Sequence, residues 1–193
     1  MYNMKLLEER IKKDGQVRPG HILKVDGFLN HQIDPVLYGH IADEIYRLFE
    51  GEKIDKIVTI EASGIGIAVM TAARFGVPAL FAKKAKSANI DNDLFVSEVK
   101  SYTYGNTYRI TVSKKYLHEG ENILIVDDFL AKGNALKGLI DIMGQAGANV
   151  VGAAICVEKE FQNGGNDLRS QGIRVESLAK IASMSDTDIT FMD

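Results

Sequence analysis

The stretch Asn122-Ile123-Leu124-Ile125-Val126-Asp127-Asp128-Phe129-Leu130-Ala131-Lys132-Gly133-Asn134-Ala135-Leu136 decides how the rest of the chain is interpreted. Its four apolar residues Ile123 to Val126 are typical of a buried strand in a parallel sheet. Two adjacent carboxylates and a loop of small residues follow, and an apolar-periodic helix begins near Leu136. Ligands of open α/β sheets bind beyond the carboxyl ends of the strands, so this stretch predicts a binding site.

The loop and the acidic pair suit different parts of one ligand. Small residues that open a helix expose backbone N–H groups, and these groups together with the helix dipole can hold a phosphate. Asp127 and Asp128 would repel a phosphate, but they suit a neighbouring polyol such as ribose, or a cation. An acidic pair can also be a solvated strand end, yet the spacing to Gly133 and to the helix favours a phosphate and a sugar bound side by side.

The run from Val126 to Ala135 resembles the loop that binds phosphoribosyl pyrophosphate (PRPP) in type I phosphoribosyltransferases. Threonines commonly flank the glycine of that loop, whereas Lys132 and Ala135 stand there in this chain. The run Val25-Asp26-Gly27-Phe28-Leu29-Asn30-His31-Gln32-Ile33-Asp34-Pro35 extends the resemblance to the purine-salvage members that use xanthine.

The resemblance implies an α/β fold with a central, mainly parallel sheet flanked by helices. It also implies one phosphoribosyltransferase domain over residues 1–193, with a small hood at about 1–35 and a flexible loop and β-hairpin at about 83–112. Within the hood region, Asp34 can cap a helix that has Pro35 at its first position and runs to Gly51.

Composition sets broad limits on the function. A length of 193 residues suggests one domain, and a net charge of −3 argues against a dedicated nucleic-acid surface. The single Cys156 cannot form an internal disulfide, so we expect a cytoplasmic protein, and its place in an apolar strand predicts a buried structural thiol. We expect no secretory leader and no membrane span, because no apolar run approaches the necessary length of about 20 residues.

A second strand–loop–helix unit offers another anion site. Lys56 to Ile60 reads as a strand, and Glu61-Ala62-Ser63-Gly64-Ile65-Gly66 leads into a helix that ends near Phe75, before Gly76. A tight turn is the simpler interpretation of such a loop in isolation. The resemblance implies that Ala62, Ser63 and Gly64 contact pyrophosphate.

Basic residues follow the next predicted strand, Val77 to Ala82. They can belong to a solvated surface loop, or they can support a pyrophosphate from the family's mobile loop, with Lys84 preferred over Lys86. Two alternating segments come next, Val96 to Tyr104 and Thr107 to Val112, and the Gly105-Asn106 pair between them predicts a hairpin. The three tyrosines of this hairpin, Tyr102, Tyr104 and Tyr108, are interpreted as structural.

The resemblance also implies a purine pocket made by Leu23, Asn30 and Lys159. Lys159 lies beyond a predicted strand, Asn149 to Val157, where its ammonium can donate to a purine 6-oxo group and Phe161 could stack on the ring. A lysine donor rejects adenine, whose 6-amino group is itself a donor, but it does not separate xanthine, guanine and hypoxanthine. Without the resemblance, Lys159 reads as an ion-paired surface residue and Asn30 as a turn residue.

The implied reaction transfers phosphoribose from PRPP to xanthine, giving xanthosine 5′-monophosphate (XMP) and pyrophosphate. Asp127 and Asp128 would hold the ribose, Ser63, Gly64 and Lys84 the pyrophosphate, and the loop Ala131, Lys132, Gly133, Asn134 and Ala135 the 5′-phosphate. Mg²⁺ would be bound mainly through PRPP and water. A homodimer is expected from the resemblance. The alternatives are a guanine or hypoxanthine enzyme and a non-catalytic PRPP-sensing regulator.

Overall fold

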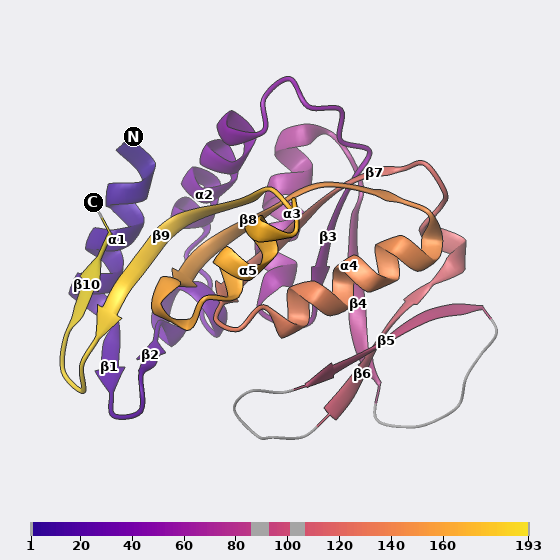
Figure 1. Cartoon of the computed structure of the whole chain (residues 1–193). Helices are drawn as coiled ribbons and strands as arrows, with labels where there is room; N and C mark the ends of the chain where they lie inside the picture. The colour runs from indigo at the N-terminus through magenta and orange to yellow at the C-terminus, as the bar shows by residue number, and fades with distance from the viewer. Residues whose placement is uncertain (1, 86–92, 101–106, 193) are drawn as a thin grey trace.

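A computed structural model describes residues 2–85, 93–100 and 107–192. Among these residues an eight-stranded sheet has the order β10-β9-β8-β7-β3-β4-β6-β5 (Figure 1). The five strands from β9 to β4 in this order pair in parallel, and the outer strands pair antiparallel. The sheet strands are β3 (Lys56–Ile60), β4 (Ala79–Ala85), β5 (Leu94–Lys100), β6 (Thr107–Ser113), β7 (Asn122–Leu130), β8 (Asn149–Lys159), β9 (Val175–Met184) and β10 (Ile189–Phe191). The predicted mainly parallel sheet is therefore confirmed.

Helices cover both faces of this sheet. The helices are α1 (Tyr2–Asp14), α2 (Pro35–Leu48), α3 (Gly64–Phe75), α4 (Asn134–Ala146) and α5 (Gly164–Ser170). Figure 1 shows α4 and α5 on the near face and α2 and α3 on the far face. One apolar cluster lies under α1, α2 and α3, and a second lies under α4 and extends to β5 and β6.

The predicted start of α2 and end of α3 are confirmed, whereas α2 ends at Leu48 and not at Gly51. Asp34 caps α2, since its Oδ1 accepts hydrogen bonds from the N–H groups of Val36 and Leu37, and Pro35 is the first helical residue. Gly76 ends α3 in the left-handed conformation.

The N-terminal segment forms a small unit beside the sheet. Strands β1 (Gln16–Arg18) and β2 (Ile22–Lys24) make a separate antiparallel ribbon, and a π-helical turn at Asp26–Asn30 leads to α2. The ribbon places residues 19–21 in its turn, and this turn lies beside the end of β8.

Several strands are longer than the sequence predicted, among them β4, β7 and β8, which ends at Lys159 and not at Val157. β4 continues to Ala85, so Lys84 lies on a strand and not in a loop, because β6 pairs with this part of β4. β7 continues through the acidic pair to Leu130, because β8 extends beside it. Short apolar runs underestimate the length of such strands, because the partner strand that extends them comes from elsewhere in the chain.

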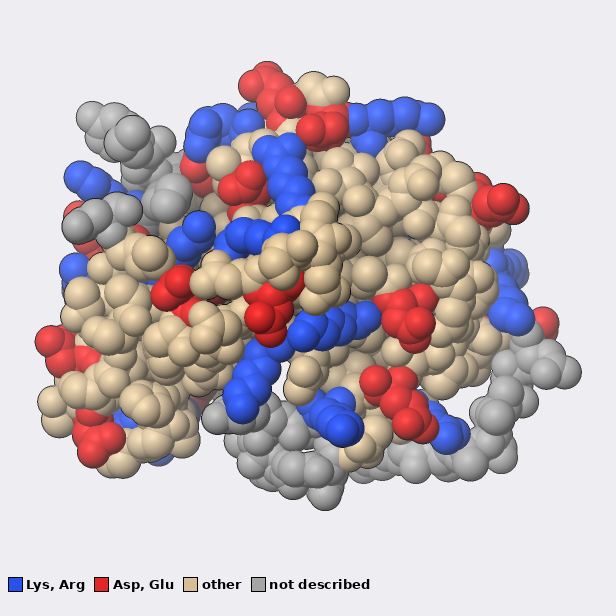
Figure 2. Space-filling view, viewed as in Figure 1, with Lys and Arg blue, Asp and Glu red and all other residues tan. Residues whose placement is uncertain are grey.

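The predicted hairpin is confirmed as the antiparallel pair β5 and β6. Its expected turn, Gly105-Asn106, and the tyrosines Tyr102 and Tyr104 lie outside the described residues, as does Lys86 of the predicted basic loop. On the face shown in Figure 2, lysine and arginine side chains are interspersed with aspartate and glutamate. Within the described part of the chain, no helix has the length and apolarity needed to cross a membrane.

Candidate active site

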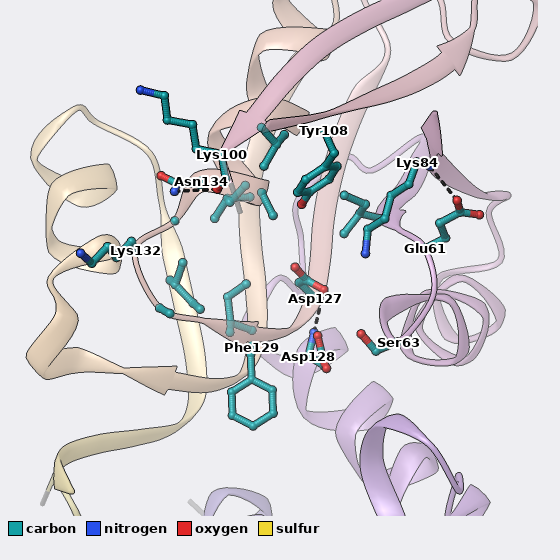
Figure 3. Close-up of a pocket in the computed structure, with 18 residues that line it drawn as sticks. Glu61, Ser63, Lys84, Lys100, Tyr108, Asp127, Asp128, Phe129, Lys132 and Asn134 are labelled. Atoms are coloured by element: carbon teal, nitrogen blue, oxygen red, sulfur yellow. Dashed lines mark hydrogen bonds between the residues drawn. The ribbon is translucent and has the colours of Figure 1, made fainter. Parts of the chain in front are cut away.

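A cavity of about 590 Å³ opens at the carboxyl ends of β3, β4 and β7 (Figure 3). This is the location that the open-sheet rule predicts. Nine residues named from the sequence line it: Ser63, Lys84, Asp127, Asp128, Ala131, Lys132, Gly133, Asn134 and Ala135. The structure therefore brings the acidic pair and both predicted anion loops to one space.

The acidic pair lies at the floor of the cavity. Asp127 and Asp128 expose only 7% and 8% of their surface, and the N–H of Asp128 donates to Oδ1 of Asp127 at 3.0 Å. Burial, followed by the charge of Asp128, raises the pKa of Asp127 well above its ordinary value. Ionisation of Asp127 is therefore unfavourable beside Asp128, and a nearby cation would favour its charged form.

Gly64 lies beneath this pair and does not line the cavity. A Cβ atom at Gly64 would come within 1.9 Å of the Thr59 hydroxyl oxygen and 3.2 Å of Asp127 Oδ1. The absence of a side chain at Gly64 therefore lets the start of α3 approach the acidic pair. Its predicted contact with pyrophosphate stays a prediction.

The loop before α4 has the geometry of an anion cradle. Gly133 adopts the left-handed conformation with φ of 75°, and α4 begins at Asn134, so N–H groups at the helix start face the cavity. The Asn134 amide donates to the carbonyl of Lys100 at 3.0 Å, which joins the loop to β5. This hydrogen bond holds the loop in place, although the threonines that commonly flank its glycine are absent from this chain.

The start of α5 supports this loop from behind. The N–H of Gly164 donates to the carbonyl of Ala131 at 3.1 Å, and a Cβ at Gly164 would lie only 2.3 Å from that oxygen. The Leu168 side chain packs on the other side, 3.2 Å from where a Gly133 Cβ would be. The close packing that requires glycine at position 164 is visible only in three dimensions.

The second loop faces the first across the cavity. Ser63 lines the wall, and the Glu61 carboxylate accepts a hydrogen bond of 2.6 Å from the Lys84 N–H. The peptide bond between Glu61 and Ala62 is cis. In Figure 3 the Lys84 side chain extends toward Asp127.

Three functional candidates escaped the sequence analysis: Glu61, Tyr108 and Phe129, all of which line the cavity. Burial, followed by the charge of Asp127, raises the pKa of Tyr108, and the Lys84 ammonium lies 5.6 Å from its ring centre. Glu61 could have been found by the rule that identified the acidic pair, because it directly follows β3. Tyr108 has no comparable signal, since it comes from the hairpin.

The predicted purine residues occupy different positions beside the cavity, and Lys159 is not among the residues that line it. The Asn30 amide donates to Asp128 Oδ2 at 3.3 Å, and Asn30 lines an adjoining hollow of about 510 Å³ that shares Ser63 and Lys84 with the main cavity. Leu23 is buried in the core and lines neither space. The structure thus places Asn30, but not Leu23, in direct contact with the acidic pair.

Lys159 ends β8 and lies behind Phe129. Its Nζ donates to the carbonyl oxygen of His21 at 2.8 Å and lies 5.8 Å from the centre of the Phe129 ring. Burial lowers the pKa of Lys159. The predicted stacking residue Phe161 contacts the His21 ring, with 5.4 Å between ring centres.

A buried ion pair holds the strand end that carries Lys159. The Glu158 carboxylate accepts from Arg169 at 2.7 and 2.9 Å and from the Ser177 hydroxyl at 2.5 Å. Burial raises the pKa of Glu158, but the hydrogen bonds from Arg169 and Ser177 outweigh it, so the pKa is lowered overall. A Cβ at Gly165 would lie 1.9 Å from Glu158 Oε1, so this pairing needs a glycine. Glu158 therefore forms its ion pair with Arg169 and not with its neighbour Lys159.

Cys156 is a fully buried free thiol, as predicted, and burial raises its pKa. In the described residues no group of three or more His, Cys, Asp or Glu side chains is arranged to hold a metal ion. The cavity nevertheless offers carboxylate and hydroxyl oxygens from Glu61, Ser63 and Asp128. Such oxygens suit an Mg²⁺ ion that a phosphate ligand brings with it, because this ion needs only one or two protein carboxylates.

Known proteins resemble this chain in sequence. The family model for the phosphoribosyl transferase domain matches residues 29–168. The chain is 54% identical over 190 residues to a xanthine phosphoribosyltransferase of Alkaliphilus metalliredigens, with 98% of this chain and 94% of the relative covered. It is 52% identical over 189 residues to a protein of the same name from Bacillus cytotoxicus, with 98% and 96% covered.

Solved structures share the fold at low sequence identity. An adenine phosphoribosyltransferase from Thermoanaerobacter pseudethanolicus has a TM-score of 0.73 and 24% identity, over 90% of this chain and 99% of that one. An APRTase from Giardia lamblia has a TM-score of 0.77 and 19% identity, over 90% and 97%. These two likenesses concern the fold, and they confirm the predicted fold class.

Proposed function

Since the chain belongs to the phosphoribosyltransferase family, we propose that it transfers the phosphoribosyl group of PRPP to xanthine, forming XMP and pyrophosphate in purine salvage. The observation that carries this proposal is one cavity in which the acidic pair lies between the two predicted anion loops. The relatives that share about half of the sequence over nearly the whole chain are named for the same reaction.

The acidic pair supplies the electrostatic part of the mechanism. Bond breaking at the anomeric carbon leaves positive charge on the ribose, and Asp127 and Asp128 would face that sugar through its hydroxyl groups. Negatively charged carboxylates attract a cationic sugar more strongly than the uncharged ribose of PRPP. Such a difference between ground state and transition state is what accelerates a reaction.

The anion loops would hold the two ends of PRPP. The N–H groups of the loop Ala131, Lys132, Gly133, Asn134 and Ala135 would bind the 5′-phosphate, and Ser63, Gly64 and Lys84 would receive the leaving pyrophosphate. Holding both ends fixes the sugar over the acidic pair, so the chain contributes mainly by positioning. Bound Mg²⁺ would neutralise pyrophosphate charge, with Glu61, Ser63 and Asp128 offering oxygen atoms beside it.

Three residues, Leu23, Asn30 and Lys159, would form the base corner, the part of the site that selects the purine. The Lys159 ammonium donates to a 6-oxo group, whereas adenine presents a donor there. Asn30 contacts Asp128, so it joins the base corner to the sugar site. Leu23 would support the corner from the core.

The enzyme is proposed to act as a homodimer in the cytoplasm. The cytoplasmic location rests on the single, buried cysteine. An exposed apolar surface supports the dimer: Ile33, Val36 and Val69 expose 50%, 69% and 52% of their surface. Ile33 packs next to Gly66 of α3, and Val69 lies one turn further along the same helix. Light scattering at assay concentration tests this, and a monomer would contradict it.

The test of the reaction compares xanthine, guanine, hypoxanthine and adenine, each with PRPP and Mg²⁺, for the wild type and Lys159→Ala. We expect turnover of xanthine above the other bases, reduced by roughly 100-fold in the variant. A preference for guanine or hypoxanthine would keep the mechanism and replace the base. PRPP binding without turnover of any base would contradict the enzyme and favour the regulator.

A further inference from the structure

The turn of the β1–β2 ribbon reaches the end of β8. Its last residue, His21, uses its carbonyl oxygen to accept a hydrogen bond of 2.8 Å from Lys159 Nζ, across 138 positions of sequence. His21 also contacts Phe161, the second residue after Lys159, through its ring. Two contacts from one residue thus fasten the ribbon to the strand end that carries Lys159.

The direction of this carbonyl depends on an uncommon backbone conformation. His21 has φ of 59°, which is the left-handed region that non-glycine residues rarely adopt. The preceding Gly20 also has a positive φ, 83°. The contact between the His21 and Phe161 rings, which lie 5.4 Å apart at 54°, offsets part of the cost of this conformation.

The Lys159 ammonium is thereby held between two partners. The His21 carbonyl takes one of its three N–H groups, and its Nζ lies 5.8 Å from the centre of the Phe129 ring, a residue of the cavity wall. Among the described contacts no other hydrogen bond uses this ammonium, which leaves two N–H groups for a ligand. A flexible lysine held in this way loses little further freedom when it binds a base.

We propose that His21 is a positioning residue for base selection: its left-handed backbone presents the carbonyl that aims the Lys159 ammonium at the 6-oxo group of the purine. This inference rests on the proposed function, in which Lys159 reads that group. It adds that recognition of the base depends on a backbone carbonyl from the N-terminal ribbon.

The experiment varies the backbone preference at position 21. His21→Val resists a positive φ, because valine is β-branched, so the carbonyl should turn away and KM for the base should rise roughly tenfold. His21→Gly adopts the same φ freely and loses only the ring, so its KM for the base should stay within about threefold. KM for PRPP should be unchanged in both variants, since the PRPP loops lie on other elements.

One control variant and one replacement test variant separate positioning of Lys159 from a general loss of structure. Arg18→Val places the same side chain on the same ribbon, where Arg18 is exposed and bonds only to Gln16 among the contacts described, and it should leave both KM values unchanged. If His21→Val does not fold, His21→Ala carries the same test with a smaller rise in KM, because alanine also disfavours the left-handed region.

A double-mutant cycle gives the decisive result. In a Lys159→Ala background, His21→Val should have no further effect on the residual reaction, because its target is gone. An undiminished effect in that background, or a normal KM for the base in His21→Val, would overturn the proposal. If the wild type uses no 6-oxopurine, the proposed function itself is overturned. The wild-type reaction in the same assay distinguishes this outcome from a failure of the His21 proposal.

Discussion

The PRPP half of the site and its base corner are built in opposite ways. The acidic pair and the phosphate loop come from one continuous run, Asp127 to Ala135, supported by an adjacent strand and by the start of α5. The residues proposed for the base come from separate segments: the Asn30 amide bonds to Asp128, and Lys159 bonds to the carbonyl of His21. In the proposed function, the transfer reaction thus rests on a contiguous motif, whereas the choice of base rests on a few long-range contacts.

The largest expected effect is that of Asp128→Asn, which tests whether the acidic pair acts on the sugar. We expect kcat to fall by roughly 100- to 1,000-fold, because one of the two charges facing the cationic sugar is removed. Steady-state kinetics with saturating xanthine and PRPP measures it. Asp186→Asn, an exposed carboxylate for which the described contacts show no partner, should change nothing. A fall of less than threefold in Asp128→Asn would show that the acidic pair does not act on the sugar.

Gly164→Ala tests whether the phosphate loop needs its support. The added Cβ would lie 2.3 Å from the Ala131 carbonyl, so the loop must move, and kcat/KM for PRPP should fall roughly 10- to 100-fold. Gly144→Ala on exposed α4 is the control, because a Cβ there meets nothing within 4 Å and alanine favours helices. Equal kinetics for the two variants would contradict a supporting role for α5.

Asn30→Ala sharpens the contrast, because it should act on the base and not on PRPP. We expect KM for xanthine to rise about five- to tenfold through the lost amide, with KM for PRPP within about twofold. Gln32→Ala, an exposed neighbour of the same turn, serves as the control. A larger effect on PRPP than on xanthine would show that Asn30 serves the sugar through Asp128 rather than the base.

The smallest effect concerns stability. Asp127→Asn keeps an oxygen acceptor for the Asp128 N–H and carries no ionisable group, so it avoids the free-energy cost of burying the Asp127 carboxyl at neutral pH, and the melting temperature should rise by roughly 2–4 °C. Native Asp127 has a raised pKa and keeps a proton that the unfolded chain releases, so wild-type stability falls as pH rises above the ordinary carboxyl range.

The difference in melting temperature between Asp127→Asn and the wild type should therefore shrink as the pH falls through about 4, because the unfolded carboxyl becomes protonated in this range. Thermal unfolding followed by circular dichroism at the two pH values measures it. If Asp127→Asn melts below the wild type at neutral pH, the unfavourable burial of Asp127 beside Asp128 is contradicted.

Much of this protein follows from its sequence alone. Strand, acidic pair, phosphate loop and helix follow one another from Asn122 to Ala146, and local rules identify such a unit because its parts are neighbours in the chain. The same holds for the cap at Asp34, the end of α3 at Gly76 and the buried Cys156. The single-domain organisation and the role of each site residue stay predictions.

Only the tertiary structure decided the rest. The length of β4, the place of Tyr108 in the cavity wall and the need for glycine at position 164 depend on partners far along the chain. The hold of His21 on Lys159 joins residues 138 positions apart and depends on one carbonyl that no side-chain pattern encodes. Periodicity and spacing report local geometry, whereas these features arise from the packing of distant segments against one another.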